Sequence, residues 1–233
     1  MEVIEFIKGI NEDIFLPGLQ REFVWNKDQV EDLFDSLIRD YPVGIITLWN
    51  VKRTTTNQPT YNMVENFASD EDRIPDPIRD KYTPSITEHD TQDEDADVLV
   101  IDGQQRLTAL KIGFSGRIAE YTGGSSGSKD DPENWSTYEL CINLFGHPDK
   151  HRSYLSGDYE FKFRPTGEFK VNGGGEDGPK KMVNDEEKKL WYPVPEFLDE
   201  SDDPRNDIYE EVNSIIEEEF DNSSVLELLK DTK

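Results

Sequence analysis

The stretch Val98-Leu99-Val100-Ile101-Asp102-Gly103-Gln104-Gln105-Arg106-Leu107-Thr108-Ala109-Leu110 decides the fold. Its first four residues are apolar and three of them are β-branched, which is typical of a buried strand. Asp102-Gly103 then predicts a tight turn, because glycine tolerates a positive φ. Leu107, Leu110 and Phe114 follow at helical spacing. The stretch therefore predicts a strand, a sharp turn and a helix.

Polar side chains cluster at this turn and in the first turn of the expected helix: Asp102, Gln104, Gln105 and Arg106. The first backbone N–H groups of a helix have no partner within it, and the helix dipole is positive there, so such a terminus suits an anion. Glutamine and arginine side chains bind phosphate oxygens or position a water molecule. The alternative is a structural turn whose glutamine and arginine side chains face solvent.

Two motifs carry a resemblance to a known family. Asp102-Gly103-Gln104-Gln105-Arg106-Leu107-Thr108 resembles the signature of the N-terminal domain of GmrSD-type, modification-dependent restriction proteins, a branch of the ParB/sulfiredoxin-like superfamily. Leu16-Pro17-Gly18-Leu19-Gln20-Arg21-Glu22-Phe23-Val24-Trp25 is similar to that family's other motif. Gly103 to Ala109 also resembles the phosphate-contacting box of ParB, with Arg106 at the matching arginine. The chain further resembles the phosphorothioate-sensing SspE type, and the likeness extends loosely to Trp191-Tyr192-Pro193-Val194.

The resemblance implies an α+β fold, with a ParB/sulfiredoxin-like mixed sheet and flanking helices. It implies an NTPase, the regulatory domain of an anti-phage restriction system, with nucleoside triphosphate bound and hydrolysed at the turn. Arg106 and Arg21 would hold phosphates, with Gln20 and Gly103 beside them. Gln104 or Gln105 would orient water, and Asp102 would bind Mg²⁺ or accept a proton. From local sequence alone, Arg21 is equally a surface arginine paired with an acid.

The family's partners would be DNA, carrying a modification, and an HNH-type nuclease domain or subunit. Because the chain ends without a nuclease module, we expect no nuclease activity from it alone. The alternative function is recognition of modified DNA, such as phosphorothioate DNA, without essential NTPase activity. A patch of Arg21, Arg106, Lys111 and Arg117 would then bind DNA. A third hypothesis is an assembly domain that uses the apolar C-terminal end.

Length and composition bound the organisation of the chain. We expect a ParB-like domain over residues 1–198, with an acidic insertion at about 52–97, and an acidic helical segment over 199–233 that leads to an effector domain. The single cysteine excludes an internal disulfide. The sequence has no apolar run of membrane-spanning length and its first residues do not resemble a signal peptide, so we expect a cytoplasmic protein.

The net charge of −26 is unevenly distributed. Residues 65–97 carry 12 acids and 3 bases, and residues 199–233 carry 13 and 3, so the other 165 residues hold only −7. The segments with the two motifs therefore need not repel an anionic ligand. The overall charge opposes broad nonspecific DNA binding. Such acidity also resembles the proteins of salt-adapted organisms.

Several further elements follow from the pattern. Asn26 and Gln29 form a capping box, with Trp25 and Val30 at hydrophobic-staple positions, at the start of an amphipathic helix. Residues 43–51 are expected to form a buried strand, and residues 52–97 a solvated loop. Two half-buried strands are expected over 138–144 and 159–164, and the second should form a hairpin with 169–171. A helix is expected over 208–220. The first 15 residues fit a helix or an extended segment equally.

Two possible ion sites fail on their pattern. His147 and His151 have the spacing of a metal pair, but Pro148 intervenes and no third ligand is evident. Asp93, Asp95 and Asp97 lack the glycine and glutamate of a calcium loop.

Lys162 and Arg164 share one face of a strand and would meet nucleic acid or, as we slightly favour, solvent. Mg²⁺ is the expected cofactor.

Overall fold

The computed structural model describes residues 3–18, 23–52, 60–64, 66–68, 75–82, 96–143, 160–166, 183–184 and 189–198. The helices are α1 (Val3–Lys8), α2 (Lys27–Ile38), α3 (Asp76–Tyr82) and α4 (Gln104–Ser115), with short 3-10 helices η2 (Pro132–Asn134) and η3 (Val194–Leu198). The strands are β1 (Ile14–Pro17), β2 (Thr47–Lys52), β3 (Thr60–Tyr61), β4 (Phe67–Ala68), β5 (Ala96–Asp102), β6 (Ile118–Tyr121), β7 (Trp135–Asn143), β8 (Glu160–Pro165), β9 (Val183–Asn184) and β10 (Lys189–Pro193). The predicted α+β class is confirmed.

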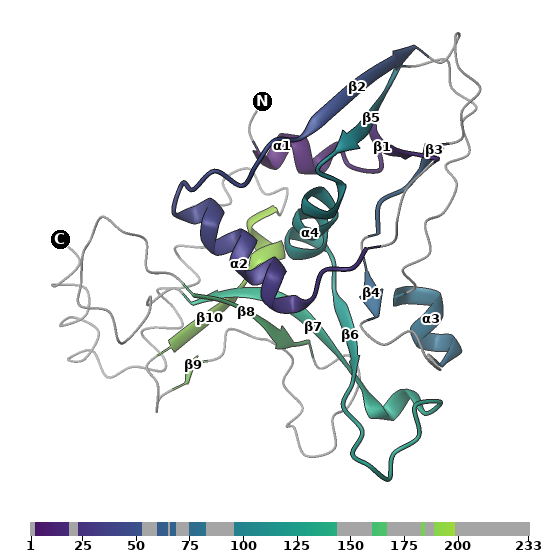
Figure 1. Ribbon diagram of the computed structural model, residues 1–233. Helices are drawn as coiled ribbons and strands as arrows, with labels where there is room; N and C mark the ends of the chain where they lie inside the picture. Colours follow the sequence, from purple (N-terminus) through teal and green to yellow (C-terminus); the bar gives the residue numbers. More distant parts are fainter. Residues whose placement is uncertain are drawn as a thin grey trace, which may run out of the picture.

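The first sheet is mixed, as the sequence predicts, and has the order β2-β5-β1-β3. β5 runs parallel to β1, with Leu99 opposite Phe15, and antiparallel to β2, with Leu99 opposite Trp49. The second sheet has the order β4-β6-β7-β10-β9, and β8 pairs with β7 off this path. Figure 1 shows the β2–β5 ribbon at one end of the molecule and the second sheet across the middle.

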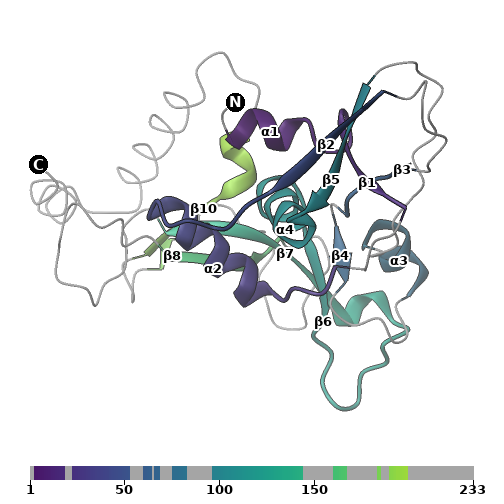
Figure 2. The ribbon, with the colours of Figure 1, turned by 45° about the horizontal axis from the view of Figure 1, so that its top comes forward.

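Helix α4 lies between the two sheets, beside α2 (Figures 1 and 2). It is buried on several sides, because Leu107, Ala109 and Ile112 are all fully enclosed. At Gly113 a Cβ would lie 2.4 Å from the Phe34 ring, so glycine lets α2 approach α4 closely. The main apolar core gathers residues of α1, α2, α4 and both sheets. The predicted strand, turn and helix are therefore the central part of the fold.

Helix α2 begins as its sequence predicts. The Asn26 side chain accepts the Gln29 N–H at 3.0 Å, and the Gln29 side chain accepts the Asn26 N–H at 3.1 Å. Val30 is fully buried, and Trp25 packs against the same core. This confirms the capping box and places Trp25 in a structural role. The undecided first 15 residues contain both types of structure, since α1 is followed by β1.

Three expectations about secondary structure and burial are wrong. Residues 43–46 are not a strand, and Thr47 to Asn50 of β2 are exposed, because no element in the described part of the chain covers them. The insertion at 52–97 is not only a loop: it contains β3, β4 and α3, and its apolar residues Met63, Phe67 and Ile78 are buried in apolar clusters. Strand β7 is buried on both faces.

Some expectations lie outside the described residues: the three histidines, the strand at 169–171 and the helix at 208–220. Within the described part of the chain, none of the helices has the length and apolar character needed to span a bilayer.

Candidate functional site

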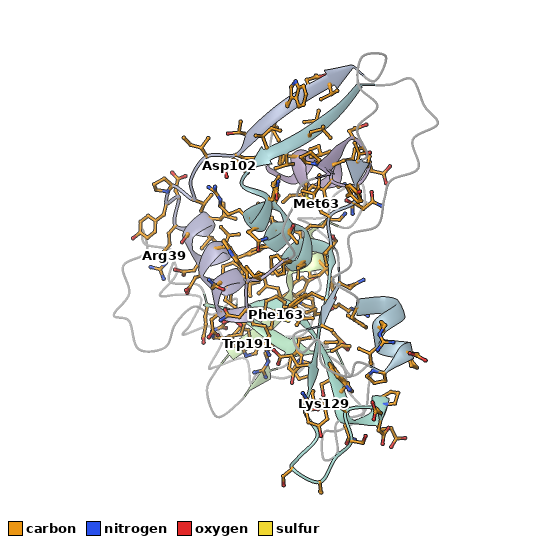
Figure 3. The ribbon with its side chains drawn as sticks, turned by 45° about the vertical axis from the view of Figure 1, so that its right-hand side comes forward. Arg39, Met63, Asp102, Lys129, Phe163 and Trp191 are labelled. Atoms are coloured by element: carbon orange, nitrogen blue, oxygen red, sulfur yellow. The ribbon has the colours of Figure 1, made fainter. Side chains whose placement is uncertain are left out.

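The turn between β5 and α4 has the geometry that Asp102-Gly103 predicts. Gly103 has a φ of 89°, and a Cβ there would lie 3.0 Å from Ile46 Cγ1 and 3.3 Å from the Ile45 carbonyl oxygen. Asp102 Oδ1 accepts the Gly103 N–H at 2.8 Å, and the Asp102 side chain is exposed. Figure 3 shows Asp102 where β5 meets α4, away from Phe163 and Trp191 of the second sheet. The turn therefore presents an oriented carboxylate at a helix start.

Gln105 joins the two sequence motifs. Its Oε1 accepts the backbone N–H of Val24 at 3.0 Å, across 81 residues of chain. At the other end of the motif over residues 16–25, Leu16 and Pro17 belong to β1, the strand that neighbours β5. Gln20 and Arg21 lie outside the described residues, but both flanks of their segment reach the β5–α4 unit. The two motifs therefore lie together, as a shared site requires.

Arg106 is engaged by the segment that precedes β2. Its Nη1 donates to the Val43 carbonyl oxygen at 2.9 Å. Gly44, with a φ of 93°, passes so close that a Cβ would lie 1.9 Å from the same Nη1. One of the five N–H donors of Arg106 thus fixes the 43–46 segment, and the others are a separate resource for an anion.

Gln104 has a different partner from Gln105. Its Nε2 donates to the Val100 carbonyl oxygen at 3.0 Å, which ties the first helical residue back to the strand. The first intrahelical bond runs from the Leu107 N–H to the Gly103 carbonyl, so the N–H groups of residues 104–106 have no acceptor within α4. The structure thus gives each predicted polar residue of this turn a defined position.

Three residues near the turn that sequence reasoning missed, Val24, Val43 and Gly44, act through their backbones. Only Gly44 leaves a signal, because a glycine that interrupts the apolar run Val43-Gly44-Ile45-Ile46 marks a close backbone approach. The apolar residues around it instead predict a continuous strand. A backbone N–H or carbonyl can belong to any residue, so the other two leave no signal.

Two groups of strand β7 in the second sheet, Glu139 and Cys141, have raised pKa values. Desolvation raises the pKa of the Glu139 carboxyl, and the Arg117 guanidinium 3.7 Å away opposes that shift. Burial also raises the pKa of the Cys141 thiol, which makes it a poor nucleophile at neutral pH. Lys162 pairs with Glu31, and Arg164 lies over the Trp191 ring. Both cations therefore have partners within the protein, and Lys162 is at the same time exposed to solvent.

The donors present at the turn suit Mg²⁺ only in a limited way. Among the described residues, no three histidine, cysteine or acidic side chains lie together as a metal site. Mg²⁺ that travels with a nucleotide needs only one or two protein carboxylates, since phosphates and water supply its other ligands. The exposed Asp102 carboxylate fits that requirement.

Comparisons with known proteins agree with the motifs. A family model described as "GmrSD restriction endonuclease, N-terminal domain" matches residues 3–231. An uncharacterized protein of Methanocaldococcus jannaschii is 27% identical over 103 residues, which cover 44% of this chain and 15% of that protein. The matched part is thus a small share of the relative's length.

Proposed function

Because the chain belongs to the family of GmrSD restriction endonuclease N-terminal domains, we propose that it binds and hydrolyses a nucleoside triphosphate. The phosphates would lie at the turn from Asp102 to Arg106. In this proposal the domain regulates a DNA-modification-dependent restriction system. A nuclease domain or subunit of the HNH type would cut the DNA, and this chain would control it.

The observation that supports one shared site is the bond between Gln105 and the Val24 N–H. It links the family's two motifs: the segment with Gln20 and Arg21 follows β1, which pairs with β5, and precedes Val24, which binds Gln105. A phosphate at the start of α4 would meet the N–H groups of residues 104–106 and the positive end of the helix dipole.

The side chains then divide the work of phosphoryl transfer. Mg²⁺, when bound with the nucleotide, would neutralise phosphate charge, and Asp102 would hold it or accept a proton from water. Arg106 would use its remaining N–H donors on a phosphate oxygen, and Arg21 would add a second cation. Gln104 or Gln105 would orient the attacking water. Catalysis of this kind rests on positioning and charge stabilisation.

The test is phosphate release from ATP, GTP, CTP and UTP with Mg²⁺ by the 233-residue chain and by Asp102→Asn. An asparagine oxygen still accepts the Gly103 N–H, so the variant loses the charge and keeps the turn. We expect turnover to fall roughly 100-fold, which is typical when one key electrostatic group is removed. Asp76→Asn, an exposed aspartate on α3, is the matched control and should turn over nucleotide like the parent.

Equal turnover by the parent and by Asp102→Asn would contradict the assignment of this turn. If the folded parent hydrolyses none of the four nucleotides, the alternative of modified-DNA recognition takes its place. A gel shift that compares phosphorothioate with plain duplex tests that alternative, and negligible binding to both would remove it.

A further inference from the structure

Strand β2 is an edge strand of the first sheet in the part of the chain that the structure describes. It closes one end of the first sheet, with β5 as its partner on one side, among the residues that the structure describes. Every residue from Thr47 to Asn50 is exposed. Native proteins protect such edges with charges, proline or a covering element, because the free N–H and C=O groups accept another strand. Strand β2 contains no proline, and its one charged residue, Lys52, is the last residue of the strand.

The edge is also apolar. The exposed fractions are 39% for Leu48, 46% for Trp49, 77% for Ile45 and 48% for Ile101. Trp49 lies opposite Leu99 and on the same face as Val51. Leu99 and Val51 form a small buried cluster with Phe15. Trp49 therefore extends a buried cluster into solvent. Leu48 and Trp49 point to opposite faces of the strand, so both faces of this edge expose apolar side chains, which is typical of an interaction site.

The charge of this region sets it apart from the rest of the chain. Residues 41–64 contain no aspartate or glutamate, whereas at the average of 51 acids in 233 residues such a stretch would carry about five. Two molecules that each carry a net charge of −26 repel one another over most of their surfaces. A contact between two copies is least opposed where acids are missing.

We propose that β2 pairs antiparallel with β2 of a second copy of this chain, around a two-fold axis, to make one continuous sheet. A two-fold contact needs a self-complementary patch, and an antiparallel edge strand provides one. If both copies keep the same face outward, opposed residues must lie on the same face of the strand. Trp49 then lies opposite Trp49 or Val51 of the second copy. Tryptophan is well suited to the centre of such an interface.

The first experiment measures the mass of the whole chain in solution by light scattering, at rising protein concentration. We expect the parent to approach twice 26.9 kDa, and Trp49→Lys to stay at the mass of one chain at every concentration. Ile38→Lys, an exposed apolar residue at the end of α2, is the matched control and should associate like the parent. Circular dichroism establishes that each variant is folded.

A second experiment does not depend on removing tryptophan. Asn50→Cys, treated with a short thiol cross-linker, should give a covalent dimer, while Ser126→Cys in the exposed loop before β7 should not. The native Cys141 is buried and does not compete. Salt should strengthen the association because it screens the charge of both copies, whereas salt weakens phosphate contacts.

Three results would overturn the proposal. A parent that stays monomeric at all concentrations and salt levels would exclude pairing between two copies, and the partner of this edge would then be a strand of a different protein. A Trp49→Lys dimer would place the contact on another surface. Equal cross-linking of the two cysteine variants would show that their collisions are nonspecific.

Discussion

At the scale of single residues, the packing of Gly44 against Arg106 predicts a large effect from one methyl group. Gly44→Ala would place a side chain at a positive φ and within 1.9 Å of Arg106 Nη1, so the bond to the Val43 carbonyl must break. We expect a loss of about 1–3 kcal/mol in the free energy of unfolding. Urea denaturation measures it. Gly124→Ala, which meets nothing within 4 Å, is the matched control, and an equal loss there would contradict the argument.

The same scale shows how far the sequence predicts this site. The turn at Gly103 follows from residue types with few alternatives, whereas the joining of the two motifs is what the family resemblance implies. The structure agrees with both. The partners of Gln104 and Gln105 do not follow, because neighbouring residues of one type point in different directions on a helix. Their acceptor and donor are backbone groups of Val100 and Val24. Those groups become partners only once the chain has folded.

At the scale of elements, Glu31 of α2 closes the edge of β8. Its Oε1 accepts the buried Phe163 N–H at 2.9 Å, and its Oε2 pairs with Lys162. Glu31→Ala would leave that N–H buried and unsatisfied, so we expect a loss of about 1–3 kcal/mol in the free energy of unfolding. Glu31→Gln keeps an acceptor for Phe163 and should lose less. Urea denaturation of both variants checks the order, and equal losses would contradict it.

The pH dependence of this pair has a definite sign. The hydrogen bond to Glu31 raises the pKa of Lys162 above its ordinary value. The stabilisation is therefore full below the unfolded pKa of lysine, about 10.4, and is lost as the pH rises through the folded pKa. The parent and Glu31→Gln should differ at neutral pH and converge in alkali. A difference that stays constant across this range would exclude the ion pair as its cause.

Elements with strong local signals were predicted best. The capping box of α2 and the apolar positions of α4 fix those helices from nearby residues alone. The burial of β2 could not be predicted, because an apolar strand reads the same whether a layer covers it or not. In the insertion, the acidic composition predicts a solvated loop, so the few apolar residues that are buried in the core could not be recognised from it. The contacts of Lys162 with α2 likewise join residues 131 apart in the chain.

At the scale of the whole molecule, net charge competes with individual ion pairs. Salt weakens pairs such as Arg79–Asp76, but an exposed pair contributes at most about 1 kcal/mol. Salt also screens the net repulsion that opposes the compact state and that arises because 51 acids outnumber 25 bases. Residues 65–97 and 199–233 hold most of the net charge, and we expect the net repulsion of the chain to outweigh the attraction within the exposed pairs.

We therefore expect NaCl to stabilise the chain. A gain of 1 kcal/mol raises the Tm by about 2–4 °C for a protein of this size, so a rise of at least that amount should accompany added salt. Thermal unfolding followed by circular dichroism measures it, at one fixed protein concentration so that association does not contribute. A zwitterionic osmolyte at equal osmolality is the control, because it carries no net charge and does not screen. If the Tm instead falls with salt, ion pairs outweigh repulsion, and the acid-free edge at β2 loses its electrostatic rationale as the place where two copies meet.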